Sequence, residues 1–493
     1  MSAEETMMAS GNASWMLISA ALVLLMTPAL ALFYGGMSRQ KSVLNMMMMS
    51  FSTLGVVTVV YILWGWSMSY GSQSLAGIFA NPLEFFGLRD SILDAEGNYL
   101  MGSAGYANTI DIAFQLTFAV ISTALISGAL AERVKFSTWM VFSGAWATLV
   151  YFPLAHMVWG GGLLSHSGNS LAAWLFGTTG GEATIAPIDF AGGTVVHISA
   201  GTAALILALI IGRRRTFPHT PHRPHNLPLV MLGAALLWFG WFGFNGGSAF
   251  AADGLAGLAW LNTTAATAAA MLGWLAVEKL RDGQPTSLGA ASGVVAGLVT
   301  ITPAAGALTP MTSLLLGLVG GGLACLGVGL KYRFGFDDSL DVVGVHLVAG
   351  LWGTVGVGLL ATDIGWFSGG GFAGLKLFLV QILIAVVAML FTASLTAVLA
   401  LALKFSLGWR LSKEAEFNGV DLDQHRESAY DQGGIQFSRT VVLPTLPGDT
   451  FSADAGEEVS AAPGEGKVES SPVGDTPATR ESDATLDAEK QEI

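Results

Sequence analysis

The sequence predicts an all-α polytopic membrane protein with eleven transmembrane helices. Residues 1–410 contain only 16 of the 22 basic and 17 of the 35 acidic side chains, whereas roughly a quarter of an ordinary soluble protein is charged. The chain is 52% hydrophobic and holds 63 glycines, a composition that suits helices packed closely within a bilayer. This composition excludes a soluble globular enzyme.

Each predicted helix is an apolar segment long enough to cross a bilayer, which takes about 20 residues. The segments lack the alternation of apolar and polar residues that barrel strands require, so helices are the remaining way to satisfy the backbone in lipid. They lie near residues 15–34, 43–66, 108–130, 137–158, 190–211, 228–250, 255–277, 287–306, 311–330, 340–361 and 374–405.

The basic residues predict the orientation, because Lys and Arg are concentrated in cytoplasmic loops. Fourteen follow the odd-numbered segments, against two, Arg89 and Lys376, on the opposite side. We therefore expect a multi-pass protein of the plasma membrane with its N-terminus outside and its C-terminus inside. The fourteen are Arg39, Lys41, Arg133, Lys135, Arg213, Arg214, Arg215, Arg223, Lys279, Arg281, Lys331, Arg333, Lys404 and Arg410.

The chain is expected to divide into a helical domain over residues 1–410, a short segment over 411–430 and an acidic tail over 431–493. The tail is rich in Gly, Pro, Ser, Thr and Glu, a composition that predicts disorder. It is either a regulatory tether or a solvated extension. Most of the formal net charge of −13 belongs to residues after 410, and nothing in the sequence indicates a nucleic-acid partner.

A pattern shared by the two halves predicts an inverted five-helix repeat. Asp-x7-His-x-x-Ala-Gly occurs from Asp189 to Gly201, with His197, and again from Asp338 to Gly350, with His346. The offset of 149 residues skips five crossings, so the two copies run through the membrane in opposite directions.

The two histidines are the first candidates for a site. Eight residues at 1.5 Å each place both imidazoles near the membrane midplane, where ionisable groups usually mark a pathway. A pair of imidazoles can guide a small polar molecule or relay a proton; packing and metal binding are the alternatives, but no third metal ligand lies at a matching depth. Asp189 and Asp338 are interpreted as helix caps rather than substrate contacts.

Aromatic residues lie where the predicted helices meet the outer surface. Phe118, Trp159, Trp241 and Phe244 belong either to an aromatic belt or to a cluster that holds a small cation by its ring faces. Their spacing does not decide between the two.

These residues and several long blocks resemble the ammonium transporter (Amt/Mep/Rh) family, and within it the Amt branch. The resemblance runs from the first predicted helix to about Tyr430. The blocks that carry it are GALAERVKFS (128–137), AHMVWGGGLL (155–164), DFAGGTVVHISAG (189–201), PHNLP (224–228), GWFGFNGGSAF (240–250) and DVVGVHLVAG (341–350).

The resemblance implies a homotrimer in the lipid bilayer, with one ammonium pore in each subunit. Ammonium would be captured outside and deprotonated, and ammonia would pass with or without the proton. The implied roles are recruitment by Trp159, Phe118 and Ser248 with support from Asp189, gating by Phe118 and Phe244, and a pore lined by His197, His346, Trp241 and Thr302.

Residues 411–430 resemble the family's cytoplasmic regulatory segment, through which subunits can be coupled. Glu416, Gly419, Asp421, His425 and Tyr430 match its motif. Members are often blocked by PII-type signalling proteins from the cytoplasmic side, so such a partner is one expectation. The chain departs from the family in a longer external segment between Trp159 and Asp189 and in the acidic tail.

Two other functions remain open at this stage. An ammonium sensor would signal through the tail, although the tail contains no kinase or cyclase domain. An Rh-like conduit would pass neutral gas, although Trp159 and Ser248 favour the Amt branch. The sequence has neither a nucleophile paired with a base nor a phosphate loop, and we expect neither an enzyme nor a cofactor.

Overall fold

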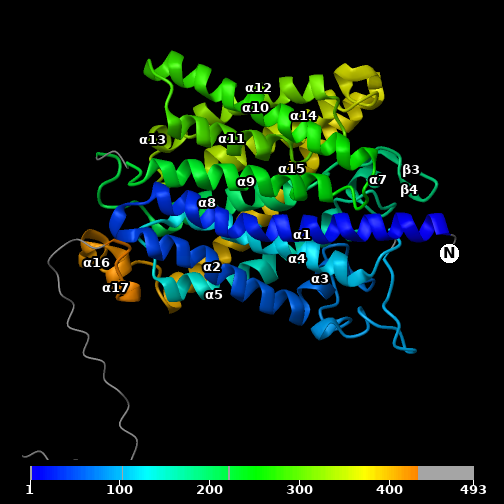
Figure 1. Ribbon diagram of the computed structural model, residues 1–493, viewed down its shortest axis with the longest axis horizontal. Coiled ribbons are helices and arrows are strands. Elements are labelled where there is room, and N and C mark those ends of the chain that lie inside the picture. Colours follow the sequence, from blue (N-terminus) through cyan, green and yellow to red (C-terminus); the bar gives the residue numbers. More distant parts are fainter. Residues whose placement is uncertain (1–2, 103, 220–222, 431–493) are drawn as a thin grey trace, which may run out of the picture. The chain divides into compact units, whose positions relative to one another are not determined.

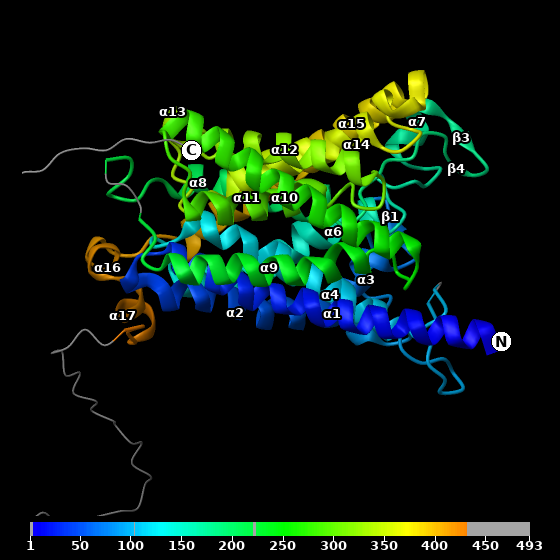
Figure 2. The same cartoon turned by 45° about the horizontal axis from the view of Figure 1, so that its top comes forward.

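Long helices that lie side by side form the protein (Figure 1). The computed structural model describes residues 3–102, 104–219 and 223–430. One end of the helices carries the N-terminus, and the other carries the short helices α16 and α17 in both views (Figures 1 and 2). We call these ends the N-terminal face and the α16–α17 face. The predicted acidic tail, residues 431–493, lies outside the described residues.

The order of the elements follows the predicted segments closely. Several spans combine an α-helix with a π-helical stretch (η). The long helical elements are α1 (Ala3–Met37), α2 (Val43–Val60) with η2 (Tyr61–Gly65) and α3 (Trp66–Tyr70), α4 (Asn108–Leu125), α5 (Phe136–Trp146) with η5 (Ala147–Tyr151) and α6 (Phe152–Val158), η6 (Gly193–Ile198) with α8 (Ser199–Ile211), α9 (Leu227–Gly247), α10 (Gly254–Asp282), α11 (Ser287–Ile301), α12 (Pro310–Gly327) with α13 (Leu330–Phe334), η7 (Val343–Val348) with α14 (Ala349–Leu360), and η8 (Trp366–Gly370) with α15 (Gly371–Ser406).

Ten helical stretches among the described residues are long and apolar enough to cross a membrane. The remaining predicted span, the eighth along the chain, corresponds to α11, which ends at Ile301 rather than at residue 306 and has 15 residues, about 22 Å of helix. Residues 302–307 continue it as turns. The prediction of an all-α membrane protein is confirmed, with one span shorter than expected.

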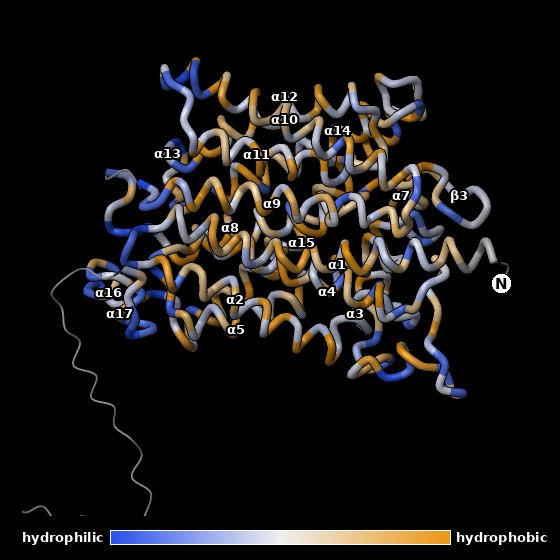
Figure 3. The backbone as a smooth tube through the Cα atoms, viewed as in Figure 1, coloured by the Kyte–Doolittle hydropathy of each residue, from blue (hydrophilic) through white to orange (hydrophobic). Residues whose placement is uncertain are grey.

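Hydropathy separates the middle of the helices from their ends. Hydrophilic residues gather at the two faces, and hydrophobic ones fill the band between them (Figure 3). Within the band, large apolar side chains such as Phe51, Phe239 and Val398 are exposed. Such residues suit a surface that faces lipid hydrocarbon rather than water.

Short elements cover the N-terminal face, where the sequence predicted only loops. One hairpin pairs β1 (Ser74–Leu75) with β2 (Phe79–Ala80), and another pairs β3 (Thr178–Thr179) with β4 (Glu182–Ala183). The helix α7 (Leu171–Phe176) precedes the second hairpin. This hairpin and α7 lie within the long segment between Trp159 and Asp189.

Close contact between α10 and α12 depends on small residues. A Cβ atom on Gly317 would lie 2.1 Å from the carbonyl oxygen of Ala266, and one on Gly321 would lie 2.0 Å from that of Ala270. A Cβ on Gly273 would in turn meet the carbonyl oxygen of Leu318 at 2.1 Å. The helix backbones therefore touch, which is how membrane helices gain packing energy without a hydrophobic driving force.

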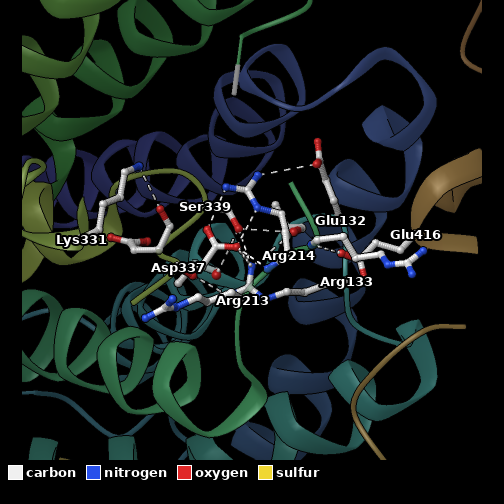
Figure 4. A network of polar contacts seen from close by, with 12 residues as sticks. Glu132, Arg133, Arg213, Arg214, Lys331, Asp337, Ser339 and Glu416 are labelled. Carbon is white, nitrogen blue, oxygen red and sulfur yellow. Dashed lines mark hydrogen bonds and ion pairs between the residues drawn. The ribbon is translucent and has the colours of Figure 1, made fainter. Parts of the chain in front are cut away.

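A buried ion network joins the loops of the α16–α17 face (Figure 4). The Arg214 side chain donates to both carboxylate oxygens of Asp337 at 3.0 and 2.9 Å, and Arg133 donates to the Asp337 carbonyl oxygen at 2.6 Å. Burial opposes the charge of Asp337, but the Arg214 hydrogen bonds and the Arg133 charge still hold its pKa below the ordinary value. Glu132, paired with Arg39 at 2.7 Å, extends the network.

The C-terminal helices α16 (Lys413–Asn418) and α17 (Val420–His425) dock on this face through two carboxylates. Glu416 accepts a hydrogen bond from the Arg215 backbone N–H at 2.9 Å and pairs with Arg410. Asp421 accepts hydrogen bonds from the backbone N–H groups of Leu44 and Asn45 at 3.0 and 2.8 Å. The Asp421 carboxylate thus satisfies free N–H groups at the start of α2, as a capping residue would.

We expect Gly321→Ala to lower the thermal midpoint of the purified protein, measured by tryptophan fluorescence. The added methyl group must push α10 and α12 apart, and overpacking of this kind costs about 1–3 kcal/mol. Gly257→Ala on α10 is the control, because nothing lies within 4 Å of its Cβ position. Equal midpoints for both variants would contradict the tight contact.

We expect Asp421→Ala to expose the C-terminal segment to trypsin. Loss of the cap costs about 1–2 kcal/mol, so cleavage after Lys413 and Arg426 should become several-fold faster, as measured by mass spectrometry of the fragments. Asp423→Ala removes the same charge from an exposed position on the same helix and should leave the rate unchanged. The same acceleration in both variants would show that charge, not capping, matters.

Candidate functional site

A cavity of about 330 Å³ opens on the N-terminal side of the helices. Its walls combine aromatic rings with a few hydrogen-bond acceptors, a mixture that suits a small polar or cationic ligand. The lining residues are Trp66, Tyr70, Asp111, Gln115, Phe118, Val158, Trp159, His166, Asp189, Phe190, Ser248 and Phe250.

A row of aromatic rings leads from the cavity into the protein. The ring of Trp159 meets Phe118 edge to face at a centroid distance of 6.1 Å. Phe118 then stacks on Phe244 at 4.1 Å, and Phe244 is fully buried. Trp159 directly follows α6, and Phe118 and Phe244 lie in α4 and α9, so three separate segments of the sequence build the row.

Two more ring systems continue the row beyond Phe244. Its ring lies 5.2 Å from Trp241 and 6.2 Å from His197, and His197 stacks on Trp241 at 5.5 Å. The Trp241 indole N–H donates to the Thr302 hydroxyl oxygen at 2.9 Å, and that hydroxyl donates to the Leu298 carbonyl oxygen at 2.7 Å. Thr302 thus fixes the indole that packs against the imidazole.

The two histidines meet at the end of the row. The Nδ1 atoms of His197 and His346 are 3.3 Å apart, and both side chains are buried. At this distance one Nδ1 carries the shared proton and the other accepts it. The outer Nε2 atoms of a neutral pair then differ, since one is an acceptor and the other an N–H donor. His197 Nε2 has no hydrogen-bond partner among the described residues.

Two glycines of the repeated motif permit this contact. A Cβ on Gly201 would lie 2.5 Å from the backbone nitrogen of Leu347, and a Cβ on Gly350 would lie 3.1 Å from the Cβ of His197. Gly201 therefore lets the segment of His346 approach α8, and Gly350 lets the segment of His197 approach α14. Both histidines also lie in π-helical stretches, η6 and η7, which often occur at functional sites.

A carboxylate caps the start of each π-helical stretch. Asp189 accepts hydrogen bonds from the backbone N–H groups of Gly192, Gly193 and Thr194, and from the Thr194 hydroxyl. Asp338 accepts from the N–H groups of Val342 and Val343 at 3.1 and 2.7 Å. The geometry fits the interpretation of both residues as caps. Burial raises the pKa of Asp189 and raises that of Asp338 to about 6.

The structure brings the predicted site residues into one column. Trp159, Phe118, Ser248 and Asp189 line the cavity, and Phe244, Trp241 and the two histidines follow below it. Asp189 also positions Trp159, because its backbone carbonyl oxygen accepts the indole N–H at 3.0 Å. The Ser248 hydroxyl donates to the Phe244 carbonyl oxygen at 2.8 Å.

Sequence reasoning missed several cavity residues, Asp111 and Gln115 among them. The spacing of Asp111, Gln115 and Phe118 by four and then three residues places them on one face of α4, and this signal could have found them. Within the described ranges, no three His, Cys, Asp or Glu side chains converge as a metal-ligand set would.

Comparison with known proteins identifies the family of the chain. A family model described as the Ammonium Transporter Family matches residues 14–430. The chain belongs to this family. The prediction of the family is therefore confirmed, and with it a multi-pass protein of the cell membrane that is a transporter-family member rather than an enzyme.

Sequence relatives and solved structures agree with this assignment. An ammonium transporter of Mycobacterium tuberculosis (strain ATCC 25618 / H37Rv) is 49% identical over 92% of this chain and 97% of its own, and one of Aquifex aeolicus is 44% identical over 87% and 95%. Saccharomyces cerevisiae Mep2 superposes with a TM-score of 0.70 at 31% identity, covering 82% of this chain and 88% of its own. A structure titled Sensor Amt Protein gives 0.74 at 26% identity, covering 85% and 100%.

We expect Asp189→Ala to lower the thermal midpoint strongly. It leaves three buried backbone N–H groups without an acceptor, each worth about 1–3 kcal/mol. Asp189→Asn keeps one acceptor oxygen and should fall in between. Asp253→Ala removes an exposed cap of α10 and should cost only about 1 kcal/mol. A larger loss for Asp253→Ala than for Asp189→Ala would contradict the capping role.

Proposed function

We propose that this protein transports ammonium across the membrane. The observation that carries the proposal is the unbroken row of rings from the aromatic cavity to the buried pair of His197 and His346. Relatives that match over nearly all of this chain are named ammonium transporters. An aromatic cavity that leads to paired imidazoles suits a small cation that enters charged and can lose a proton.

The proposal includes an inverted repeat with the N-terminus outside and the C-terminus inside. The repeated motif supports the repeat, since both copies combine an Asp cap, a π-helical histidine and a glycine contact. The excess of basic residues after odd-numbered spans supports the orientation. The N-terminal face, with the cavity, would then be the outer side.

Recruitment would use the rings and the hydroxyl around the cavity. A cation beside the faces of Trp159 and Phe118 gains about 0.5–2 kcal/mol, and the Ser248 oxygen adds a hydrogen-bond acceptor. Asp189 would support recruitment without contacting the ion. Its carboxylate is occupied by backbone donors, so it would contribute a negative field and a fixed indole rather than a ligand contact.

Phe118 and Phe244 would act as the gate. Their stacked rings lie 4.1 Å apart, too close for an ion to pass between them unless a side chain rotates. A bare cation in the membrane interior also costs at least several kcal/mol, whereas neutral ammonia does not. Loss of the proton near the gate is therefore the favourable route inward.

The histidine pair would guide ammonia and handle the proton. One Nε2 accepts and the other donates, so together they match a molecule that both donates and accepts hydrogen bonds. Two imidazolium ions in contact repel each other, so at most one positive charge fits on the pair. In a relay, one Nε2 takes up a proton, the shared proton moves from one Nδ1 to the other, and the second Nε2 releases its proton. Such a relay would make transport electrogenic, and its absence would leave neutral conduction.

A sensor is the second candidate function. The structure titled Sensor Amt Protein aligns over its whole length with this chain, so the fold alone does not separate the two. A transporter would need the residues of the row for ion movement, so substitutions in the row distinguish transport from sensing.

We further propose a homotrimer regulated through residues 411–430, with a PII-type protein as a partner on the cytoplasmic face. The docking of Glu416 and Asp421 on the loops supports a regulatory role. Movement of this segment would break their hydrogen bonds to Arg215 and to the start of α2. In this proposal, residues 411–430 are the regulatory segment and residues 1–410 are the transport domain.

We expect an ammonium pulse to produce a transient current on a solid-supported membrane carrying liposomes with the purified protein. His197→Ala and His346→Ala should lower it at least about tenfold, because proton-handling groups typically contribute 10²–10⁴-fold to rates. His219→Ala, an exposed position outside the row, should leave the current unchanged.

Two other outcomes separate the remaining mechanisms. A rapid internal pH change on an ammonia gradient without current would favour neutral conduction. Silence of the unaltered protein in both assays would reject transport and favour the sensor.

A further inference from the structure

We propose that Asp111 and Gln115 form a second cation subsite in the cavity, for ammonium or a small primary ammonium ion. The inference rests on the proposed function, since it assigns residues that would load the ion before the contact with Phe118 and Trp159. Neither residue is among those that the sequence predicted for the site.

Asp111 and Gln115 lie on the side of α4 that faces the cavity. Asp111, Gln115 and Phe118 lie on one face of the helix, and all three line the cavity. Asp111 is in the first turn of α4, which begins at Asn108. Seven residues at 1.5 Å place it about 10 Å along the helix from Phe118. An ion from the N-terminal face would therefore meet Asp111, then Gln115 and then Phe118.

The Asp111 carboxylate is available to a ligand. Its single donor among the described residues is the Tyr106 hydroxyl, at 2.7 Å from Oδ1. No basic side chain in the described part of the chain forms an ion pair with it. Asp189, the other carboxylate of the cavity, is by contrast occupied by three backbone N–H groups and a hydroxyl. Asp111 is thus the cavity carboxylate with free acceptor capacity.

Gln115 supplies an acceptor that lacks a donor. The side chain is 8% exposed, and its Oε1 is buried without a hydrogen-bond partner among the described residues. A buried acceptor left unpaired is unfavourable by about 1–3 kcal/mol, so this oxygen is suited to a ligand N–H. Ammonium carries four N–H donors and can bond both Oε1 and the Asp111 carboxylate.

The remaining walls fit a cation. Trp66 and Tyr70 pack against each other with centroids 4.7 Å apart and line the same cavity. Their ring faces add cation–π attraction. The cavity of about 330 Å³ is roughly ten times the volume of a water molecule in the liquid, so it has room for this subsite and the one beside Trp159.

One competing occupant has to be distinguished by experiment. The indole Nε1 of Trp66 is also buried and has no hydrogen-bond partner in the described part of the chain, so a water molecule between this N–H and Gln115 would satisfy both. In that case Asp111 would attract cations only through its field, and Gln115 would not contact the ion.

The test measures the half-saturating ammonium concentration from solid-supported-membrane currents of the full chain. Asp111→Asn removes the charge but keeps the shape, and Gln115→Leu removes the acceptor. Each should raise the half-saturating concentration about threefold to tenfold, as expected for loss of one charge-assisted or neutral hydrogen bond, with the maximal current within about twofold. Asp363→Asn, which neutralises an exposed aspartate outside the cavity, should change neither quantity.

Several results would overturn the subsite. They are unchanged half-saturation in Asp111→Asn and Gln115→Leu, an effect of Asp111→Asn alone, or the same effect in Asp363→Asn. Tyr106→Phe keeps the charge of Asp111, so a shift as large as that of Asp111→Asn would instead assign the effect to the Tyr106 contact.

A binding measurement separates this inference from the proposed function. Radiolabelled methylammonium is titrated onto the purified protein in detergent. Binding that weakens in Asp111→Asn and Gln115→Leu but not in Asp363→Asn supports the subsite even if the unaltered protein carries no current. Undetectable binding, or equal binding in all variants, rejects the subsite whether or not transport is observed.

Discussion

The contact between His197 and His346 is the constraint around which the interior is built. The two imidazoles approach to 3.3 Å within an apolar band, and their segments pack closely because Gly201 and Gly350 carry no side chain. The π-helical stretches fix where the rings lie along each helix. Asp189 and Asp338 then satisfy the N–H groups that begin these stretches.

Polar groups inside the protein are arranged differently in the middle and at the α16–α17 face. In the middle, the buried hydrogen bonds join neutral groups, as between Trp241 and Thr302. At the face, full charges are buried, and several of them are paired with opposite charge, as in the network of Arg214 and Asp337. Removing one partner of such a pair is far more destabilising than the pair is stabilising. The network is therefore a rigid base on which the C-terminal helices dock.

The cavity on the N-terminal face combines aromatic walls with unpaired polar groups. Among the described residues, Gln115 and Trp66 have buried polar atoms without hydrogen-bond partners, and Asp111 has a single donor. Unpaired groups of this kind are unfavourable in a resting protein. Their concentration beside Phe118 and Trp159 is most simply explained by a ligand that completes them.

The sequence by itself determined the class of the protein and the outline of its helices, because the length and apolarity of a membrane span are local properties. The repeated motif also singled out His197 and His346, since a rare ionisable residue in an apolar segment stands out without knowledge of its neighbours. The sequence did not reveal the end of α11 at Ile301, the π-helical stretches or the hairpins of the N-terminal face. Nor did it find Asp111 and Gln115, although their spacing was visible.

Only the tertiary structure decided which rings stack, which carboxylate is occupied and which is free. These properties depend on side chains that are distant in the sequence, such as Phe118 of α4 and Phe244 of α9, and that meet only in the folded protein. Asp189 and Asp111 are the same residue type beside the same cavity, and they differ in the number of donors that the fold brings to each. Hydrogen-bond satisfaction is a property of neighbours in space, so the sequence alone does not contain it in readable form.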